Sequence, residues 1–371
     1  MARPLTVLFA PDSFKGSLTS VEVARALARG WAGARADDSI LLAPLADGGE
    51  GTLIAIEAAG GWKWRDAAAH DPIGRPVTAA WLQSTDGTRA VVELAAASGL
   101  SRLGADERDP MGATTRGTGE VLMAAIDAGV RQITLGIGGS ATNDGGAGIL
   151  EVLGARFDDG RADLDGVDPR LAAVDLRIAC DVTNPLLGPT GAAATYGPQK
   201  GATVAQVAEL DGRLSTYADG LEAAVATRER DTPGAGAAGG TGFGLLVMRG
   251  RFRSVALVPG VDVVMAAADF DGKLGRADVV VTGEGRIDAQ TAFGKTALGV
   301  SRRAAAAGVA CVAVGGGVTP EGIEALAALG VVVVPVTERP QSVEEAMAAG
   351  AAPLERCGER IARLIGLKAA S

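Results

Sequence analysis

Short blocks that combine glycine with lysine or carboxylate side chains stand out in this 371-residue sequence. Five of them follow segments that we expect to be β-strands, and open α/β sheets bind ligands at the carboxyl ends of their strands. The block at residues 10–17, APDSFKGS, places Lys15 in a short loop before an expected helix. An ammonium group beside the free N–H groups of a helix start suits a phosphate. A solvated lysine next to a helix cap is the alternative interpretation.

Two other blocks place carboxylates in turns. The block ADGGEGT at residues 46–52 sets Asp47 and Glu50 among glycines. Such carboxylates bind Mg²⁺ or accept a substrate hydroxyl, and a capped tight turn is the alternative. In CDVTNP, Asp181 emerges from an apolar segment and Asn184 follows three residues later. A half-buried aspartate can orient a hydroxyl, as a phosphoryl acceptor requires, whereas the alternative is an Asx-turn before proline.

Two glycine-rich blocks allow a ligand to lie close to the backbone. The block GIGGSATNDGGAG at residues 136–148 suits a phosphate or nucleotide, but it lacks the dinucleotide fingerprint because its sixth position is Ala141. In TGEGRIDAQTAFGKT, residues 282–296, the last eight letters fit a relaxed Walker A pattern. Six residues separate that pattern from the expected strand, so we interpret the match as chance. Lys295 can still meet a phosphate at a helix start. A further block at residues 234–244 is either a ligand-facing loop or a flexible hinge.

Composition narrows the possible functions. A net charge of −9 without a basic stretch argues against a nucleic-acid partner, so an anionic ligand must be held by local donors. Because His70 is the one histidine, we expect a general base to be a carboxylate or a lysine. The apolar run at residues 5–10 is too short for a signal peptide or a membrane span. The separated Cys180, Cys311 and Cys357 fit buried free thiols and a reducing cytoplasm.

Alternating strands and helices must position these blocks. Thr19 and Glu22 form a capping box before a helix whose apolar residues recur at helical spacing as far as Trp31. Asp86-Gly87 between two alternating segments indicates a hairpin. Val-rich runs near the end are typical of strands buried on both faces of a parallel sheet. The expected strands are residues 5–10, 40–45, 77–82, 88–94, 132–137, 277–282, 310–314 and 331–336, and the other expected helices are 52–59, 117–128, 204–224, 296–307, 321–329 and a closing helix from 342.

The fold class that follows is α/β with two domains. Both ends of the chain are expected to form one discontinuous, Rossmann-like, doubly wound parallel-sheet domain, residues 1–66 plus 273–371. The residues between them, 67–272, are expected to form a mixed α/β domain inserted in the first. The length of the chain also favours two cores over one.

Taken together and in order, the blocks resemble the glycerate kinase family of the bacterial, 2-phosphoglycerate-forming type. The matching segments are APDSFKGSLTS, PLADGGEGT, GIGGSATNDGGAG, CDVTNPLLGP with YGPQKGA, GAAGGTGFG and TGEGRIDAQTAFGKT. Their agreement in order and spacing makes the resemblance specific. It implies two α/β domains with the active site in the cleft between them. We further expect a cytoplasmic monomer or homodimer without nucleic-acid or membrane partners.

The resemblance also implies a reaction. ATP with Mg²⁺ would phosphorylate D-glycerate on a hydroxyl, O2 by this resemblance, and give 2-phosphoglycerate and ADP. The alternatives are phosphorylation of O3 by the same site, an NAD-dependent dehydrogenase, and a non-catalytic protein that binds a small ligand. A dehydrogenase is disfavoured because the dinucleotide-binding fingerprint is missing and the chain has a single histidine that could act in hydride transfer.

Residue roles complete the expectation. Asp181 is expected to accept the proton of the glycerate hydroxyl, with Asp47 or Asp288 as the next candidates. Lys15 and Lys295 are expected to hold phosphates or the glycerate carboxylate, and the catalytic set is Asp181, Lys15 and Asp47. The Mg²⁺ ligands are drawn from a pool of carboxylates, namely Asp47, Glu50, Glu284 and Asp288. The remaining expected contacts to substrate or nucleotide are Asp12, Ser13, Phe14, Gly48, Gly49, Gly138, Gly139, Ser140, Asn143, Asp144, Asn184, Gly239, Gly240, Thr241, Gly283 and Gly285.

Overall fold

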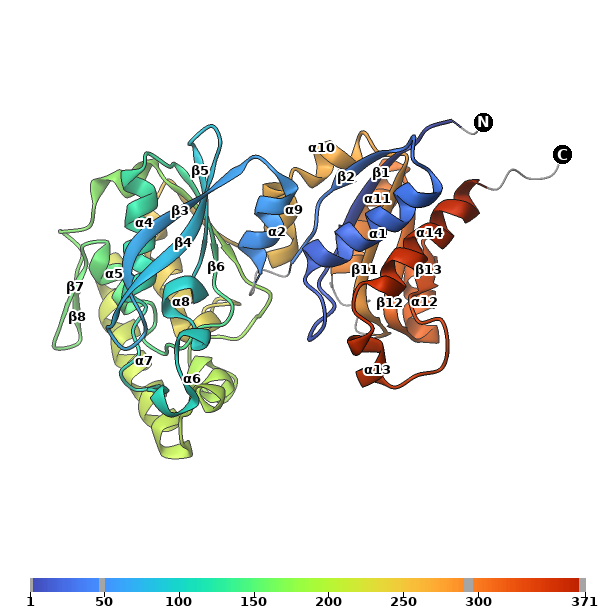
Figure 1. The fold of residues 1–371 in the computed structure, drawn as a ribbon. Helices are drawn as coiled ribbons and strands as arrows, with labels where there is room; N and C mark the ends of the chain where they lie inside the picture. The colour runs from blue at the N-terminus through green and yellow to red at the C-terminus, as the bar shows by residue number, and fades with distance from the viewer. Residues whose placement is uncertain (1–2, 47–50, 290–295, 367–371) are drawn as a thin grey trace. The chain divides into compact units, whose positions relative to one another are not determined.

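Residues 3–46, 51–289 and 296–366 are described by a computed structural model, in which the chain divides into two units. Unit 1 consists of Met1–Asp47, Ile54–Gly60 and Val264–Ser371, and unit 2 consists of Gly48–Leu53 and Gly61–Val263. Each unit has its own sheet and its own hydrophobic core (Figure 1). Both ends of the chain therefore belong to unit 1.

Unit 1 is built on a parallel five-stranded sheet in the order β13-β12-β11-β1-β2. Val and Phe side chains dominate its central strands and are buried on both faces, as the Val-rich runs of the sequence predict. The strands are β1 (Thr6–Pro11), β2 (Ser39–Leu42), β11 (Val279–Ile287), β12 (Ala310–Val318) and β13 (Val332–Pro335).

Helices cover both faces of this sheet. On one face α1 (Ser20–Ala34) packs along α14 (Ala352–Gly366), and Trp31 meets the edge of Phe9 with ring centroids 5.9 Å apart. On the other face α11 (Thr296–Ala307) brings the Ser301 hydroxyl to 3.9 Å from the Cys311 thiol. Figure 1 shows α1 and α14 in front of the sheet and α11 behind it. The predicted doubly wound parallel sheet is confirmed. The shorter helices of this part are α10 (Phe270–Leu274), α12 (Pro320–Ala327) and α13 (Val343–Ala348), while α2 (Thr52–Ala59) and α9 (Gly260–Ala267) contain residues of both units.

Some predicted element ends in unit 1 are wrong. The strand expected to stop at Thr282 continues to Ile287, because Glu284 and Arg286 pair with glycines of β12, which is itself longer than expected. Glycine thus lies inside paired strands here rather than ending them. β2 stops at Leu42, three residues before the expected end. The closing helix is two helices, α13 and α14, because Gly350 takes a φ of +60° between them.

Unit 2 contains a mixed six-stranded sheet in the order β10-β9-β6-β5-β4-β3. The predicted hairpin is present as the antiparallel pair β4 and β5, whereas β5, β6, β9 and β10 run parallel. The mixed α/β class predicted for the middle of the chain is therefore confirmed. The strands are β3 (Trp62–His70), β4 (Pro76–Ser84), β5 (Arg89–Glu93), β6 (Gln132–Gly136), β9 (Asp175–Ala179) and β10 (Ser254–Val258), with a separate hairpin of β7 (Arg156–Asp158) and β8 (Arg161–Asp163).

The edge strand β3 has no counterpart among the predicted strands. Its sequence, WKWRDAAAH, alternates weakly and holds charged residues on its exposed side, so pairing with β4 rather than its own pattern makes it a strand. The helices of unit 2 are α3 (Ala95–Ser98), α4 (Arg116–Asp127), α5 (Ala147–Val152), α6 (Ala192–Tyr196), α7 (Val204–Val225) and α8 (Ala237–Val247). Among the helices that the structure describes, none has the length and apolarity that a membrane crossing requires.

Candidate functional site

The loop between β6 and α5 in unit 2 carries several of the predicted ligand contacts. Its tip, Gly138 and Gly139, is exposed. The Gly139 carbonyl accepts the N–H of Leu100 at 2.9 Å, and the next residue, Ser140, is buried in a bridge to Gly99. The tip is therefore anchored to residues 99–100 and presents its backbone to solvent, as contact with a phosphate or a carboxylate requires.

Behind this tip lies a group of buried polar atoms. Neither polar atom of the Asn143 side chain, nor the hydroxyl of Thr142, has a hydrogen-bond partner among the residues that the structure describes. Lys200, at the end of the 3-10 helix Pro198–Lys200, is only 1% exposed and donates from Nζ to the Thr142 carbonyl at 2.5 Å. Burial lowers the pKa of Lys200 to about 7, against an opposing effect of the Asp144 carboxylate. Unpartnered buried polar atoms are rare, so this group calls for a functional explanation.

Asp144 organises the same loop from within. Its Oδ2 accepts the backbone N–H of Thr115 at 2.8 Å and the Thr115 hydroxyl at 2.7 Å, and also the N–H of Gly148 at 3.2 Å. Its Oδ1 accepts the N–H of Gly146 at 3.1 Å. Because these donors lie at the starts of α4 and α5, one carboxylate joins two helix starts, where a negative charge is favoured. The structure thus gives Asp144 a positioning role, and direct contact with a ligand stays a prediction.

The second glycine-rich segment packs on the first. Gly239 and Gly240 are buried with φ of +67° and +89°, and the Gly239 carbonyl accepts the N–H of Gly145 at 3.0 Å. A Cβ on Gly239 would lie 1.9 Å from the Thr142 carbonyl oxygen, so only glycine permits this approach. Thr241 is fully buried. The expected loop or hinge is therefore a packing element against residues 142–145, and ligand contact through it stays a prediction.

Asp181 follows the carboxyl end of β9 and reaches the surface. Its side chain is exposed rather than half-buried as predicted, because the chain leaves the sheet at Ala179. Oδ1 accepts the N–H of Gly260 at 2.9 Å, at the first residue of α9. The carboxylate is thereby oriented by a helix start and accessible to a small substrate.

Asn184 fixes the loop that follows Asp181. Its amide nitrogen donates to the Thr190 carbonyl at 2.8 Å and to the Thr195 hydroxyl at 3.3 Å, and its oxygen accepts the hydroxyl of Tyr196 at 2.8 Å. The Asn184 side chain thus spans to α6. Its predicted ligand contact stays a prediction.

In unit 1, Asp12 lies at the carboxyl end of β1 and joins the start of α11. Its Oδ2 accepts the hydroxyl of Thr296, the first residue of α11, at 2.6 Å, and its Oδ1 accepts the N–H of Ser13 at 2.6 Å. The Asp12 N–H donates to the Gly283 carbonyl of β11 at 2.8 Å. Thr296 is 2% exposed and belongs to the Walker-like pattern that we interpreted as chance, so the contact with Asp12 gives that segment a structural meaning.

Lys15 lies at the exposed tip of a tight turn. Phe14 and Leu18 exchange backbone hydrogen bonds of 2.8 and 3.0 Å across this turn, and Gly16 has a φ of +77°. The predicted capping box at the start of α1 is present, with the Thr19 hydroxyl accepting from Glu22 and the Glu22 carboxylate accepting from Thr19. The Glu22 carboxylate already occupies the start of α1, where an anion would otherwise be favoured. The turn that carries Lys15 is therefore a more suitable contact for an anion than the start of α1.

The predicted contacts at 283–288 lie in or just after β11. A Cβ on Gly283 would lie 2.3 Å from a Val314 methyl group, so this glycine serves strand packing. Glu284 is buried at 6% exposure, and Gly285 lies beside the backbone of Phe14. Asp288 forms an ion pair with Arg286 at 3.1 Å.

Five of the predicted site residues lie outside the described residues, and they are Asp47, Gly48, Gly49, Glu50 and Lys295. Of the residues beside them, Leu53 in α2 donates its N–H to the Glu93 carboxylate at 2.9 Å. Thr52 has a buried hydroxyl without a partner in the described part of the chain. Within residues 3–46, 51–289 and 296–366, no group of three or more His, Cys, Asp or Glu side chains could hold a metal ion by itself.

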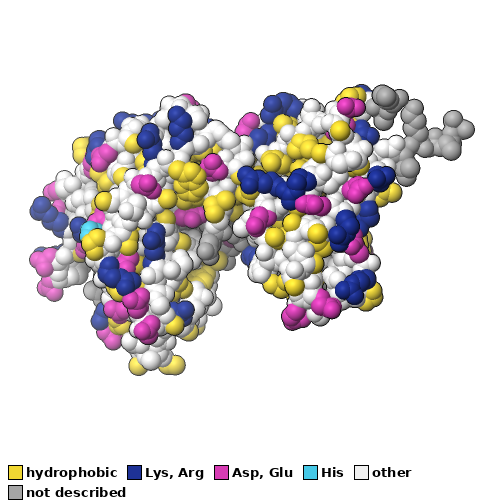
Figure 2. Space-filling view, viewed as in Figure 1, with side chains coloured by type: hydrophobic (Ala, Val, Ile, Leu, Met, Phe, Trp, Pro, Cys, Tyr) yellow, Lys and Arg dark blue, Asp and Glu magenta, His cyan; other side chains and the backbone are white. Residues whose placement is uncertain are grey.

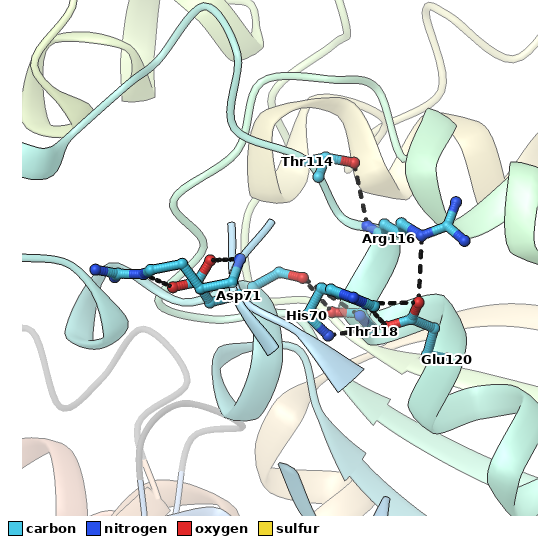
Figure 3. Close-up of polar contacts among 8 residues, drawn as sticks. His70, Asp71, Thr114, Arg116, Thr118 and Glu120 are labelled. Atoms are coloured by element: carbon cyan, nitrogen blue, oxygen red, sulfur yellow. Dashed lines mark hydrogen bonds and ion pairs between the residues drawn. The ribbon is translucent and has the colours of Figure 1, made fainter. Parts of the chain in front are cut away.

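His70 takes part in a network of polar contacts at the end of β3. Its Nδ1 lies 2.9 and 3.0 Å from the two carboxylate oxygens of Glu120, which also accepts the His70 N–H at 2.9 Å and Arg116 Nε at 3.2 Å. Figure 3 shows the imidazole and the Glu120 carboxylate facing each other, with the Arg116 side chain above that carboxylate in this view. The network ties β3 to α4.

The structure thus brings some of the predicted residues together within each unit, while the side chains of Asp181 and Asn184 have separate partners. In unit 2 residues 142–145 pack against 239–240, and Lys200 holds the Thr142 carbonyl, while the tip at 138–140 contacts residues 98–100. The sequence interpretation missed Lys200, although lysine is scarce in this chain and this one lies in the matched segment YGPQKGA. In unit 1 Asp12 meets both β11 and α11.

Comparison with known proteins gives consistent matches. The family model described as "Glycerate kinase family" matches residues 7–366. The chain is 41% identical to the glycerate kinase of Bacillus subtilis (strain 168), with 98% of both chains covered. It is 43% identical to the glycerate 2-kinase of Escherichia coli (strain K12), over 80% of this chain and 81% of that protein. The solved structure of the "putative glycerate kinase 2" of Salmonella typhimurium LT2 matches with a TM-score of 0.86 and 37% identity, and covers 98% of this chain and 99% of that one.

Proposed function

The chain belongs to the glycerate kinase family, and from this premise we propose that it transfers the γ-phosphoryl group of ATP, with Mg²⁺, to O2 of D-glycerate. The resemblance noted in the sequence is confirmed, and the protein is an enzyme of the phosphotransferase class. The choice of O2 is supported by the 43% identity to a protein named glycerate 2-kinase. The products would be 2-phosphoglycerate and ADP.

The contact between Asp12 and Thr296 is the observation that carries the nucleotide part of the proposal. In P-loop enzymes a hydroxyl at the start of a helix and an aspartate at a strand end together hold the metal that accompanies the nucleotide. Here the Thr296 hydroxyl lies 2.6 Å from Asp12 at the end of β1, the strand next to β11. The same two groups, joined at the carboxyl edge of a parallel sheet, suit a nucleotide phosphate with its metal.

The donor set fits Mg²⁺ that arrives with ATP. Mg²⁺ keeps several waters and needs only one or two protein carboxylates beside the substrate phosphates. Asp12 and the buried Glu284 of β11 would supply these, with Asp288 as a further candidate. When bound, the metal supplies charge neutralisation at the phosphates.

Asp181 is proposed as the base that accepts the proton of the glycerate hydroxyl. Phosphoryl transfer depends on positioning and charge stabilisation, and a positioned carboxylate aids the attacking hydroxyl. The N–H of Gly260 orients the Asp181 carboxylate, and its exposure allows a substrate to reach it. Lys15 would hold a phosphate or the glycerate carboxylate from its exposed turn. The backbone at Gly138 and Gly139 would contact the other anionic group.

Location and assembly follow as further proposals. A cytoplasmic enzyme would meet ATP there, and its free Cys180, Cys311 and Cys357 would stay reduced. A monomer or a homodimer would serve this reaction equally well.

The test is a coupled assay of ADP release with ATP, Mg²⁺ and D-glycerate, followed by phosphorus NMR of the product. We expect ADP release that depends on D-glycerate and a single product phosphorylated on O2. A product phosphorylated on O3 would contradict the regiochemistry alone. No release of ADP from a folded, purified enzyme would contradict the proposed reaction.

A further inference from the structure

Lys200 is a buried lysine whose presence the packing of unit 2 does not explain. The side chain is 1% exposed, and its single hydrogen bond to a described residue goes to the Thr142 carbonyl. Burying an ammonium group with incomplete hydrogen bonding is unfavourable. A neutral donor would hold the same carbonyl at a lower cost, so the charge itself calls for a purpose.

Lys273 in unit 1 shows what a structural buried lysine looks like in this chain. Its Nζ donates to two carbonyls, those of Leu42 at 2.9 Å and Ala59 at 2.8 Å. Ala59 ends α2, where the helix dipole favours a cation. Lys200 has neither a second carbonyl nor a helix end as its acceptor among the described residues. Its one acceptor is the backbone of Thr142, whose own hydroxyl is unpartnered, as is the side chain of the next residue, Asn143.

The position of Lys200 behind an exposed glycine turn suggests its purpose. Thr142, the residue that it holds, lies three residues after Gly139 in the same fixed loop. A charge in a protein interior is screened much less than one in water, so it acts over a longer distance. The net charge is −9, and Figure 2 shows cationic and anionic side chains interspersed on the viewed face of unit 2. An anion arriving at the loop therefore depends on a local positive charge.

We propose that Lys200 is a positioning residue whose charge strengthens the binding of a substrate oxyanion at the Gly138-Gly139 turn. The oxyanion is either the carboxylate of glycerate or a phosphate of the nucleotide. The proposal rests on the proposed function and adds a residue to it. Lys200 acts through the Thr142 carbonyl and through its charge, without contact with the substrate.

The titratable groups around Lys200 decide in which pH range a change in its charge can be tested. Asp144 faces the amine from the β6–α5 loop and favours its charged form. Arg108 donates to the carbonyl of Gln199, the residue before Lys200. On α6 and α7, burial raises the pKa of Tyr196 and of Tyr217 above the ordinary value near 10, so neither titrates near neutrality. Loss of the Lys200 charge is therefore expected near pH 7.

The test compares KM for D-glycerate and KM for ATP at pH 6 and pH 8.5 in four proteins. These are the wild type, Lys200→Gln, Lys200→Arg and the matched control Lys273→Gln. In the wild type we expect one of the two KM values to rise by roughly tenfold between the two pH values, the equivalent of one charge-assisted contact. Lys200→Gln should have the KM of the wild type at pH 8.5 at both pH values, because glutamine carries no charge. Lys200→Arg should have the KM of the wild type at pH 6 at both pH values, because arginine stays charged. Lys273→Gln should lower Tm and keep the wild-type pH profile.

Each outcome of this comparison either supports or contradicts the proposed role of Lys200. A shift in the glycerate KM alone identifies the carboxylate as the oxyanion, and a shift in the ATP KM alone identifies a phosphate. A folded Lys200→Gln enzyme with the wild-type KM values and pH profile would overturn the proposal and leave Lys200 a structural residue. If neither Lys200 variant folds, the wild-type profile decides, because KM values that do not change between pH 6 and 8.5 contradict it. Absence of turnover in the wild type would instead refute the proposed function, and calorimetric titration with D-glycerate would then test the anion site directly.

Discussion

At the residue scale, the carboxylates of this enzyme are positioned by backbone N–H groups at element ends. Asp12 accepts from Ser13, Asp144 from Thr115, and Asp181 from Gly260. An acceptor held in this way keeps one orientation, which a reaction that depends on positioning needs. The surroundings of these carboxylates differ. Asp144 joins the starts of two helices, which suits a positioning role, while Asp181 is exposed to solvent, where a substrate can reach it.

Replacing Asp181 by Asn should lower kcat by about 10² to 10⁴ and leave ATP binding nearly unchanged. Asn keeps the size of the side chain and an oxygen for the Gly260 N–H, but it accepts a proton poorly. Steady-state kinetics with ATP titrated by calorimetry would measure both effects. The control is Asp158→Asn, an exposed carboxylate on β7. Nearly normal activity of Asp181→Asn would contradict the assignment and make Asp47 or Asp288 the better candidate.

Replacing Thr296 by Val should raise KM for MgATP by about 10- to 100-fold, with little change in KM for glycerate. The substitution removes the hydroxyl that Asp12 accepts, and a charged group that loses its partner costs about 1–3 kcal/mol. Thr296→Ser keeps the hydroxyl and should restore the KM. If the valine variant is folded and binds MgATP normally, the pair of Asp12 and Thr296 does not belong to the nucleotide site.

At the element scale, the two glycine-rich segments of unit 2 form one packed layer rather than two separate ligand loops. Near the start of α8 three consecutive residues, Ala238, Gly239 and Gly240, interrupt the helical conformation with positive φ. This conformation turns their backbone onto residues 142–145 of the other segment. The conformation of residues 142–145 thus depends on the second segment as well as on their own sequence.

Gly239→Ala should destabilise the enzyme by more than about 3 kcal/mol, through both the clash with Thr142 and the positive φ. Urea unfolding followed by circular dichroism would measure the change. The matched control is Gly212→Ala in α7, where a Cβ would meet nothing within 4 Å. Alanine there should stabilise by about 0.4–1 kcal/mol. Equal stability of the two variants would refute the packing described for Gly239.

Asp144→Ala should also destabilise the fold, by about 2–4 kcal/mol, because it leaves the donors of Thr115, Gly146 and Gly148 without their acceptor. Hydrogen exchange should show the loss first at the starts of α4 and α5. Asp158→Ala, on the exposed hairpin, provides the reference. Uniform exchange across unit 2 would contradict a local clamp.

At the scale of the whole molecule, stability and pH are linked through buried lysines. Burial lowers the pKa of both Lys200 and Lys273. The unfolded chain releases these protons only near pH 10.4. At a pH between the folded and the unfolded pKa of such a lysine, the unfolded state binds more protons than the folded state. The free energy of unfolding therefore increases as pH rises through that range.

From pH 7 to pH 9.5 the free energy of unfolding of the wild type should therefore increase relative to that of Lys200→Met. The contribution is lost as pH falls through about 7, the folded pKa of Lys200. The expected change is of the order of a few kcal/mol. Chemical unfolding at each pH would measure it, and the effects of Lys273 and the thiols cancel in the difference. A difference that does not change with pH would mean that Lys200 keeps its charge throughout this range.

Local chemistry was enough to predict much of this enzyme from its sequence. The capping box of Thr19 and Glu22, the hairpin around Asp86-Gly87 and the Val-rich parallel strands depend on neighbouring residues, so short patterns identify them. The family resemblance likewise depends on contiguous segments. The absence of a second histidine already directed attention to carboxylates and lysines as the chemical groups.

Features that depend on partners distant in the sequence needed the tertiary structure. β11 continues through its glycines because β12 pairs with it, and β3 exists because β4 does. The Thr142 carbonyl meets Lys200 across 58 residues, and Asp12 meets Thr296 across 284. The sequence by itself determined which residue types could do the chemistry. Only the tertiary structure decided which of them are buried, paired or exposed, because burial and hydrogen bonding are set by the neighbours that folding brings together.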